Sequence, residues 1–202
     1  MMRDWLTVLL AATLLAGCAA LQPPPVETPN LYVLEAKPLA TAVRAKRDLV
    51  LEVAGPHAWP GFDTTQMIYV KRPYELDHFA ANQWADTPSR MLAPLLVQAL
   101  EQTGSFKAVV KAPGVIPADL RVDVELVRLQ QNFAARPSRV ELALRLQLTD
   151  VRTKRVLAGI TVDESENAPS DDPYGGVIAA NAALQRVLQQ VADFCVLESR
   201  SR

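Results

Sequence analysis

The sequence predicts an α+β fold, a single domain in which a mainly antiparallel sheet carries two helices packed on one face. Segments 119–126 and 139–150 alternate apolar and polar residues, which is the pattern of strands with one buried and one wet face. Segments 87–104 and 172–197 carry apolar residues at three- and four-residue spacing, as amphipathic helices do. The order of three strands, a helix, about four strands and a helix is typical of two layers around one core.

The composition supports one compact domain and argues against a nucleic-acid partner. Half of the 202 residues are hydrophobic, which is enough for a core of ordinary size. The formal net charge is −1, from 21 Lys and Arg against 22 Asp and Glu. Proteins that bind nucleic acid normally carry a basic excess, so no nucleic-acid partner is expected.

Residues 1–17 have the features of a lipoprotein signal peptide. Arg3 precedes an uncharged apolar run over residues 5–16, which is shorter than the roughly 20 residues that span a bilayer. The run leads into Leu15-Ala16-Gly17-Cys18, which resembles the bacterial lipobox, where a cysteine thiolate takes up the lipid. We predict cleavage between Gly17 and Cys18 and acylation of Cys18. An ordinary signal peptide with an accidental cysteine, or an uncleaved anchor, is the alternative.

Residues 18–30 would then be the acylated cysteine and a proline-rich tether. Proline-rich segments favour an extended backbone of about 3.1 Å per residue, so the tether can lift the domain off the membrane. In lipobox proteins of enteric-type bacteria an Asp after the cysteine tends to retain the protein at the inner membrane, so Ala19 favours the outer membrane. The predicted location is therefore the bacterial cell envelope, lipid-anchored and facing the periplasm.

The first half of the domain is expected to contain three short strands and a helix. The strands are predicted at 31–34, 48–53 and 66–71, each followed by proline or a glycine-proline pair. Residues 74–86 are mixed and aromatic and receive no assignment. Thr87 as N-cap with Pro88 in the first turn predicts the helix start, and Gly104 predicts its end.

The second half is expected to be four strands and a long helix. The strands are predicted at 106–111, 119–126, 139–150 and 154–162. Asp172-Pro173 predicts the start of the last helix. The periplasmic domain would thus span residues 31–197, followed by a short tail at 198–202.

Cys195 would be the last free thiol once Cys18 carries lipid, so no intramolecular disulfide is expected. It lies on the apolar face of the predicted last helix, which favours a buried small hydrophobe. Pairing between two molecules is the alternative.

No residue pattern indicates catalysis, a metal or a cofactor. His57 and His78 are not arranged with a nucleophile and a carboxylate, and two histidines with one free thiol do not supply a zinc site. There is no phosphate-binding loop for ATP. A Gly175-Gly176 pair is better explained by a tight turn than by a phosphate site, and the acidic residues around Asp171 by a solvated loop with a helix cap.

Aromatic residues in the loops are the candidates for partner contact. Trp59, Phe62 and Trp84 lie in or beside turn-rich segments. Exposed aromatic side chains are common hot spots of protein interfaces. The alternative is that they fill the core at the sheet edge, which fits Trp84 best.

The order of these features resembles the ABC-type transport auxiliary lipoprotein family. Leu31-Tyr32-Val33-Leu34 is similar to the family's "Y-x-L" opening, and Gln83-Trp84-Ala85-Asp86 to its tryptophan motif before the first helix. The leucine-rich helix and following strand over 91–110 are also similar. One family segment after the glycine-proline turn is missing, because residues 57–73 have a different sequence.

The resemblance implies an accessory, non-enzymatic subunit of an importer or intermembrane lipid-transfer system, including paraquat-inducible-type systems. The implied partners are an ABC permease, its ATPase and a mammalian-cell-entry-type substrate-binding protein. The protein would also be attached to the membrane through its lipid anchor. Docking or scaffolding is the implied role, and a homo-oligomer stays open. An envelope-assembly or cell-wall-synthase-activating lipoprotein and a direct lipid carrier are the alternatives.

Replacing the predicted anchor gives the first test. Cys18→Ser should leave the domain folded, because residue 18 precedes the tether, while lipid attachment and transport function are lost. Labelling of cells with radioactive palmitate measures this directly, and continued labelling of the variant would refute the assignment.

Overall fold

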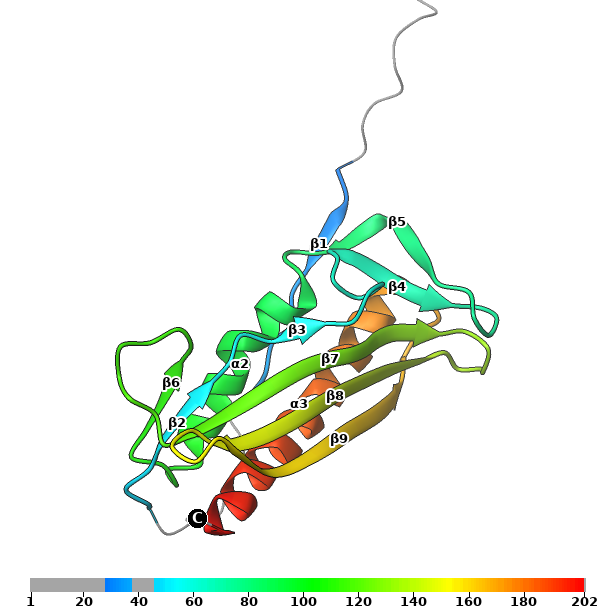
Figure 1. The fold of residues 1–202 in the computed structure, drawn as a ribbon. Coiled ribbons are helices and arrows are strands. Elements are labelled where there is room, and N and C mark those ends of the chain that lie inside the picture. The colour runs from blue at the N-terminus through cyan, green and yellow to red at the C-terminus, as the bar shows by residue number, and fades with distance from the viewer. Residues whose placement is uncertain (1–27, 38–45, 202) are drawn as a thin grey trace, which may run out of the picture.

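The computed structural model describes residues 28–37 and 46–201, which form one nine-stranded sheet covered on one face by two long helices (Figure 1). The predicted α+β fold with both helices on the same face is therefore confirmed. Antiparallel ladders hold most of the paired residues, and five shorter pairings are parallel. Within the described residues, no helix has the length and apolarity needed to cross a membrane.

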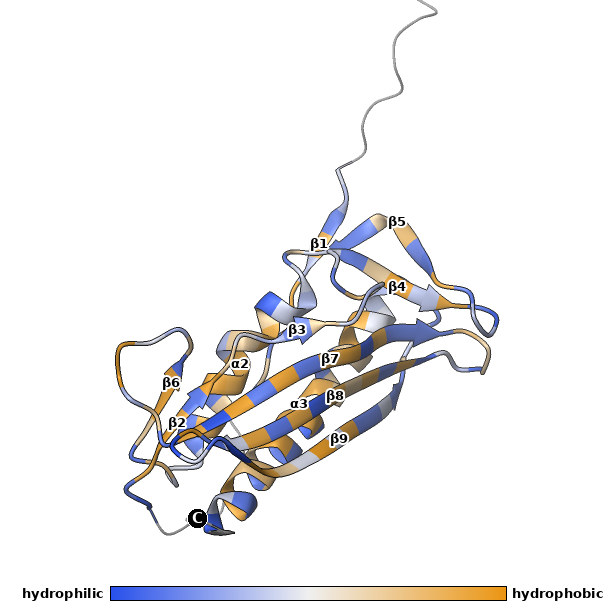
Figure 2. Ribbon diagram, in the orientation of Figure 1, coloured by the Kyte–Doolittle hydropathy of each residue, from blue (hydrophilic) through white to orange (hydrophobic). Residues whose placement is uncertain are grey.

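One side of the sheet is a meander of three long antiparallel strands, of which the last is an edge strand. These are β7 (Leu120–Asn132), β8 (Arg139–Asp150) and β9 (Arg155–Asn167). Hydrophobic and hydrophilic residues alternate along β7, and the side chains at 120, 122, 124 and 126 are buried (Figure 2). The apolar residues of the predicted alternation are therefore the ones that are buried on one face of the sheet. Strands β7 and β9 are both longer than expected.

A bulge in β7 explains why the alternation changes phase there. Leu126 pairs with Leu144 and Arg128 with Ala143, so Val127 is the extra residue. Beyond it the odd-numbered residues, Leu129 and Gln131, are the buried ones. The bulge lets one strand keep its apolar side on the helices over 13 residues.

The first half of the chain supplies six shorter strands. These are β1 (Asn30–Tyr32), β2 (Val50–Val53), β3 (His57–Ala58), β4 (Gln66–Val70), β5 (Asp77–Trp84) and β6 (Ala108–Lys111). Two of them were not predicted, namely β3 inside a loop and β5 inside the unassigned segment 74–86. Both are held by partners outside their own segment, since β3 pairs with β7 and β5 with β1 and β4.

Helix α2 (Pro88–Gln102) begins and ends where the sequence predicts. Pro88 fills the first turn, and Gly104, with a φ of 61°, lies just beyond the end. Thr87 occupies the N-cap position, but its side chain makes no capping hydrogen bond and lies 3.3 Å from the Ser89 hydroxyl instead. The predicted capping role of the Thr87 side chain is therefore wrong.

Helix α3 (Pro173–Glu198) is the main cover of the sheet and packs on β7, β8 and β9. Asp172 caps it by accepting a hydrogen bond of 2.7 Å from the Gly175 backbone N–H, which lowers the pKa of that carboxyl. Arg186 ties the helix to β9 through ion pairs of 2.7 Å with Glu164 and Glu166. A short 3₁₀ helix, η2 (Ser199–Ser201), occupies most of the predicted tail.

Residues 33–37 lie along α3 as a strap. The Asn181 side chain accepts from the Glu35 backbone N–H at 2.7 Å and donates to the Val33 carbonyl at 3.3 Å. One turn later, Gln185 accepts from the Lys37 N–H at 2.9 Å and donates to the Lys37 carbonyl at 3.2 Å. Two side-chain amides four residues apart on one helix face therefore hydrogen-bond to backbone N–H and carbonyl groups of the strap.

A glycine substitution tests the packing of α3 on the sheet. A Cβ added at Gly176 would overlap the Gln131 amide oxygen, and Gln131 is fixed by donating to the Ser138 hydroxyl at 2.9 Å and the Asp172 carbonyl at 3.2 Å. Gly176→Ala should lower the free energy of unfolding in urea by about 1–3 kcal/mol. Gly55→Ala is the matched control, because an added Cβ there has no atom within 4 Å. Equal midpoints for the two variants would contradict the packing.

Cys195 gives a test of burial that uses thiol chemistry. It is fully buried as predicted, and burial raises the pKa of its thiol from 9.0 to about 12. In the Cys18→Ser protein, where it is the only thiol, iodoacetamide at pH 8 should leave it unmodified until urea unfolds the chain. Rapid native-state alkylation would show that the C-terminal half of α3 opens.

The same burial predicts a pH dependence of stability. Because the pKa of the Cys195 thiol is higher in the folded than in the unfolded chain, the free energy of unfolding should fall as the pH rises above 9.

Candidate docking surface

The loop after β2 places Trp59 on the solvent side of the sheet. Strand β3 pairs with β7, and the Trp59 N–H donates to the Leu126 carbonyl at 2.9 Å. The Arg145 guanidinium lies 5.3 Å from the centre of the Trp59 ring, a cation–π contact, and also bonds Glu125 at 3.2 Å. Trp59 is 38 % exposed, so part of the residue is accessible to a partner. This agrees with its prediction as an exposed aromatic residue.

A tight turn separates the two aromatic residues of this loop. The Phe62 N–H donates to the Trp59 carbonyl at 2.9 Å, with Pro60 second in the turn and Gly61 third at a φ of 92°. Proline followed by a glycine of positive φ is the signature of a type II turn. Trp59 faces outward, whereas Phe62 is half-buried against the core.

The turn between β4 and β5 adds two further apolar side chains to this surface. Tyr74 is completely exposed and has a φ of 68°, and Leu76 is 49 % exposed. Positive φ is uncommon for a bulky residue, so the turn holds Tyr74 outward at some cost in backbone energy. An ion pair of 2.7 Å between Arg72 and Glu75 closes the turn.

The two turns touch each other and form one surface. A Cβ on Gly61 would lie 3.1 Å from the Leu76 side chain, so the turns are in van der Waals contact. We call Trp59, Tyr74 and Leu76 the outer patch. Sequence analysis missed Tyr74 and Leu76, because they lie in the unassigned segment 74–86. The turn residues between two alternating runs at 66–70 and 77–84 were the signal that could have identified this hairpin.

An aromatic cluster supports the hairpin from below. Tyr69 lies 4.6 Å from Phe79 and 5.8 Å from Phe133, measured between ring centres. The Tyr69 hydroxyl donates to Asp77 at 2.5 Å and, with the His78 N–H, lowers the pKa of that carboxyl. These contacts hold β4 and β5 together, so the turn that carries Tyr74 and Leu76 has a fixed position on the sheet.

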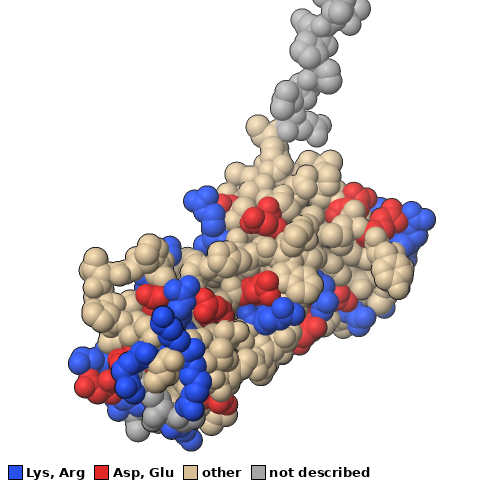
Figure 3. All heavy atoms as spheres, in the orientation of Figure 1, with Lys and Arg blue, Asp and Glu red and all other residues tan. Residues whose placement is uncertain are grey.

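Charges of both signs lie on the face of the molecule that Figure 3 shows. Beside the outer patch itself, Arg145 bonds Glu125 under Trp59, and Arg72 bonds Glu75 in the turn that carries Tyr74 and Leu76. Arg128 bonds Asp163 at 2.7 Å, and Arg121 bonds Glu52 at 3.1 Å and Asp123 at 3.0 Å. These groups neutralise one another in pairs, as expected on the wet face of a sheet. A polar rim around a small apolar centre is the composition of a protein interface.

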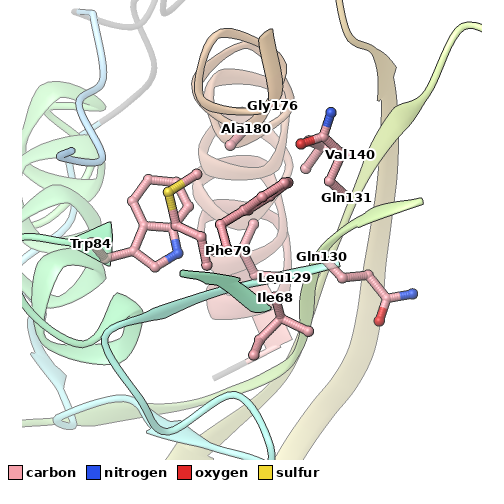
Figure 4. A pocket seen from close by; sticks show the side chains of 10 residues that line it. Ile68, Phe79, Trp84, Leu129, Gln130, Gln131, Val140, Gly176 and Ala180 are labelled. Atoms are coloured by element: carbon pink, nitrogen blue, oxygen red, sulfur yellow. The ribbon is translucent and has the colours of Figure 1, made fainter. Parts of the chain in front are cut away.

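Trp84 does not belong to this surface. It is 5 % exposed and lines a small pocket of about 20 Å³ with Phe79, Gln131 and Gly176 (Figure 4). This volume has room for about one water molecule. Trp84 is therefore a core residue, and the hypothesis that it contacts a partner is withdrawn in favour of the core alternative.

The other predicted groups are not gathered into a chemical site. His57 and His78 are exposed on different strands, and among the described residues no group of three His, Cys, Asp or Glu is arranged to hold a metal ion. Asp171 accepts a hydrogen bond of 2.6 Å from the Ser138 N–H, which lowers the pKa of its carboxyl and gives the acidic loop a structural role. Gly17 and Cys18 lie outside the described residues.

Comparison with solved structures shows that the fold is shared. A protein from Xanthomonas campestris, described as family DUF330, has a TM-score of 0.79 at 21 % identity, covering 85 % of this chain and 97 % of that chain. A hypothetical protein from Chlamydia trachomatis has a TM-score of 0.52 at 10 % identity, with coverage of 74 % and 96 %. A search of curated proteins finds no significant sequence match.

The family follows from a match that covers most of the domain. Residues 32–192 match the model of the ABC-type transport auxiliary lipoprotein component. This range begins at the last residue of β1 and ends within α3, so it includes the other eight strands and the outer patch. The chain therefore belongs to the ABC-type transport auxiliary lipoprotein family.

Proposed function

We propose that this chain is a lipid-anchored periplasmic subunit of an ABC-type transport system that works with a mammalian-cell-entry-type substrate-binding protein. Its cargo class would be lipid or another apolar compound, and its anchor would be acylated Cys18 in the outer membrane. The observation that carries the proposal is the family match over residues 32–192. The lipobox-like sequence at 15–18, with Ala19 after the cysteine, supports the anchor and its location.

Docking is the role that the geometry supports best. The outer patch presents exposed apolar side chains on two turns that contact each other, and a polar rim surrounds them. Such a surface needs no movement of the backbone to meet a partner. The exposed histidines and inward-bonded Asp171 and Asp172 offer no comparable arrangement for acid–base chemistry.

Direct carriage of a lipid inside the domain is less well supported. In the described part of the chain, the twelve largest fully buried side chains are all leucines, and they fill the space between the helices and the sheet. The pocket that lies between α3 and the sheet beside Trp84 is about 20 Å³, far below the several hundred cubic ångströms of a ligand site. The groove of about 820 Å³ between residues 31–37 and the exposed side of α3 is open at the surface and is not a cavity inside the domain. We therefore assign the protein a contact role in transport.

Co-purification from cross-linked cells tests the function as a whole. The acylated, tagged protein should retain the permease, the ATPase or the substrate-binding protein of one transport system. Recovery of a cell-wall synthase with no transport component would replace the proposal by the envelope-assembly alternative. The protein can also be purified in detergent and examined by native mass spectrometry. One bound lipid per protein, in addition to the covalent anchor, would favour the carrier alternative.

Truncating the tryptophan of the outer patch tests the docking surface. Trp59→Ala should weaken partner recovery by roughly 30-fold, the factor that corresponds to about 2 kcal/mol for an interface hot spot. Ile160→Ala is the matched control, because Ile160 is 41 % exposed but lies on β9, away from the outer patch. Both variants should remain folded, with the wild-type circular dichroism spectrum and a cooperative urea transition, although each loses the covered part of its side chain. Equal recovery of partners by the two variants would remove Trp59 from the interface.

A further inference from the structure

A second exposed apolar surface lies where β1 meets the start of α3. Leu31 and Val33 are 64 % and 44 % exposed, and Tyr174 and Ile178 are 59 % and 45 % exposed. We call these four residues the tether-end patch. They line one open groove of about 820 Å³ that runs along α3 for about three turns.

The tether-end patch is a fixed part of the fold. One wall is the strap, which Asn181 and Gln185 hold on α3 with four hydrogen bonds of 2.7–3.3 Å. Tyr32 packs against Tyr174 with ring centres 6.1 Å apart, and its hydroxyl bonds Asn82 on β5 at 3.2 Å. The exposed side chains are therefore held outward by buried and hydrogen-bonded neighbours. A set of apolar groups fixed in this way on a polar surface indicates a contact site.

The position of this patch in the chain indicates what it contacts. The first described residue, Thr28, lies two residues before β1, and β1 lies at the end of the domain opposite the β8–β9 turn (Figure 1). Thr28 is ten positions after Cys18, and ten residue steps reach at most about 35 Å. A lipid anchor at Cys18 thus keeps the tether-end patch within one tether length of the membrane surface.

The chemistry of the patch fits the interface of a bilayer. Tyr174 combines an apolar ring with a polar hydroxyl, the property that places tyrosine at membrane–water interfaces, and the other three side chains are aliphatic. The charges around the groove nearly balance. Arg186 is paired with Glu164 and Glu166, the exposed Glu35 and Lys37 of the strap are of opposite sign, and Asp172 is bonded inward as a helix cap. Contact would therefore depend on apolar insertion and only weakly on anionic headgroups or salt.

We propose that the tether-end patch rests on the phospholipid surface that holds the anchor, with its four apolar side chains entering the headgroup region. This inference relies on the lipid anchor of the proposed function but on none of its protein partners. It orients the domain, because contact at β1 and the start of α3 leaves the β8–β9 end free to face the periplasm. The tether then sets how far the domain moves when the contact opens.

Site-specific fluorescence on the acylated protein tests this contact. Ile178→Cys is labelled with the environment-sensitive dye NBD and reconstituted into phosphatidylethanolamine and phosphatidylglycerol vesicles that contain spin-labelled lipid. Labelling is selective, because Cys195 is fully buried and Cys18 carries the lipid. Val156→Cys is the matched control, with 51 % exposure at the far end of β9. We expect a blue shift and loss of fluorescence through lipid quenching at position 178 and neither at position 156.

A charge substitution separates membrane contact from mere proximity. Adding Leu31→Glu and Tyr174→Glu should abolish quenching at position 178, although palmitate labelling shows that the anchor remains. Unchanged quenching in that variant, or equal quenching at 156 and 178, would overturn the proposal. A blue shift at 178 that is insensitive to spin-labelled lipid and disappears when fewer proteins are placed in each vesicle would assign the patch to a second copy of the chain, and would also overturn it.

The failure of this inference and the failure of the proposed function can be told apart. The quenching measurement needs no transport protein, so a negative result leaves the docking role at Trp59 intact. Loss of palmitate labelling from the wild-type protein would instead remove the anchor on which both proposals depend.

Discussion

Burial of one leucine-rich face of β7 and β8 under α3 is the contact on which the rest of the molecule depends. Leu142, Leu144, Leu146 and Leu148 follow one another along β8 with no exposed surface above 1 %. Each such side chain contributes roughly 1.5–3 kcal/mol when it leaves water, so the register of the meander is strongly fixed. A slip by one residue would turn all four leucines into solvent. The bulge at Val127 is part of the same constraint, because without it the second half of β7 would face the wrong way.

Because the helices cover one face of the sheet, the opposite face is exposed to solvent and carries mostly polar and charged residues. Arginines and carboxylates pair across β7, β8 and β9, which keeps the surface soluble without a large field of one sign. The outer patch interrupts this polar face only where β3 and the β4–β5 turn reach over it. The apolar side chains of the outer patch therefore occupy a small area. The interface of a permanent complex is larger and more hydrophobic.

The two exposed apolar surfaces have different structural supports, which suits different contacts. The outer patch stands on turns that project from the sheet and is surrounded by charges, as a protein interface is. The tether-end patch is built into the junction between the strap and α3, directly after the tether, and consists of aliphatic residues and one tyrosine. Under the proposed function, the domain has to stay at a membrane while it contacts a protein partner. Separation of the two surfaces on one rigid domain allows both contacts at the same time.

The sequence alone determined the elements whose signals are local. The alternation over 139–150, the Pro88 start of α2 and the Asp172 cap of α3 are each written within a few consecutive residues, and all three are found in the structure. The tertiary structure alone decided what depends on distant partners. Strands β3 and β5 are ordered by pairing with segments far along the chain, and the type II turn sends Trp59 outward while its neighbours cover Phe62. Whether an aromatic residue such as Trp84 lies inside or outside is set by the elements that close over it, which no local pattern records.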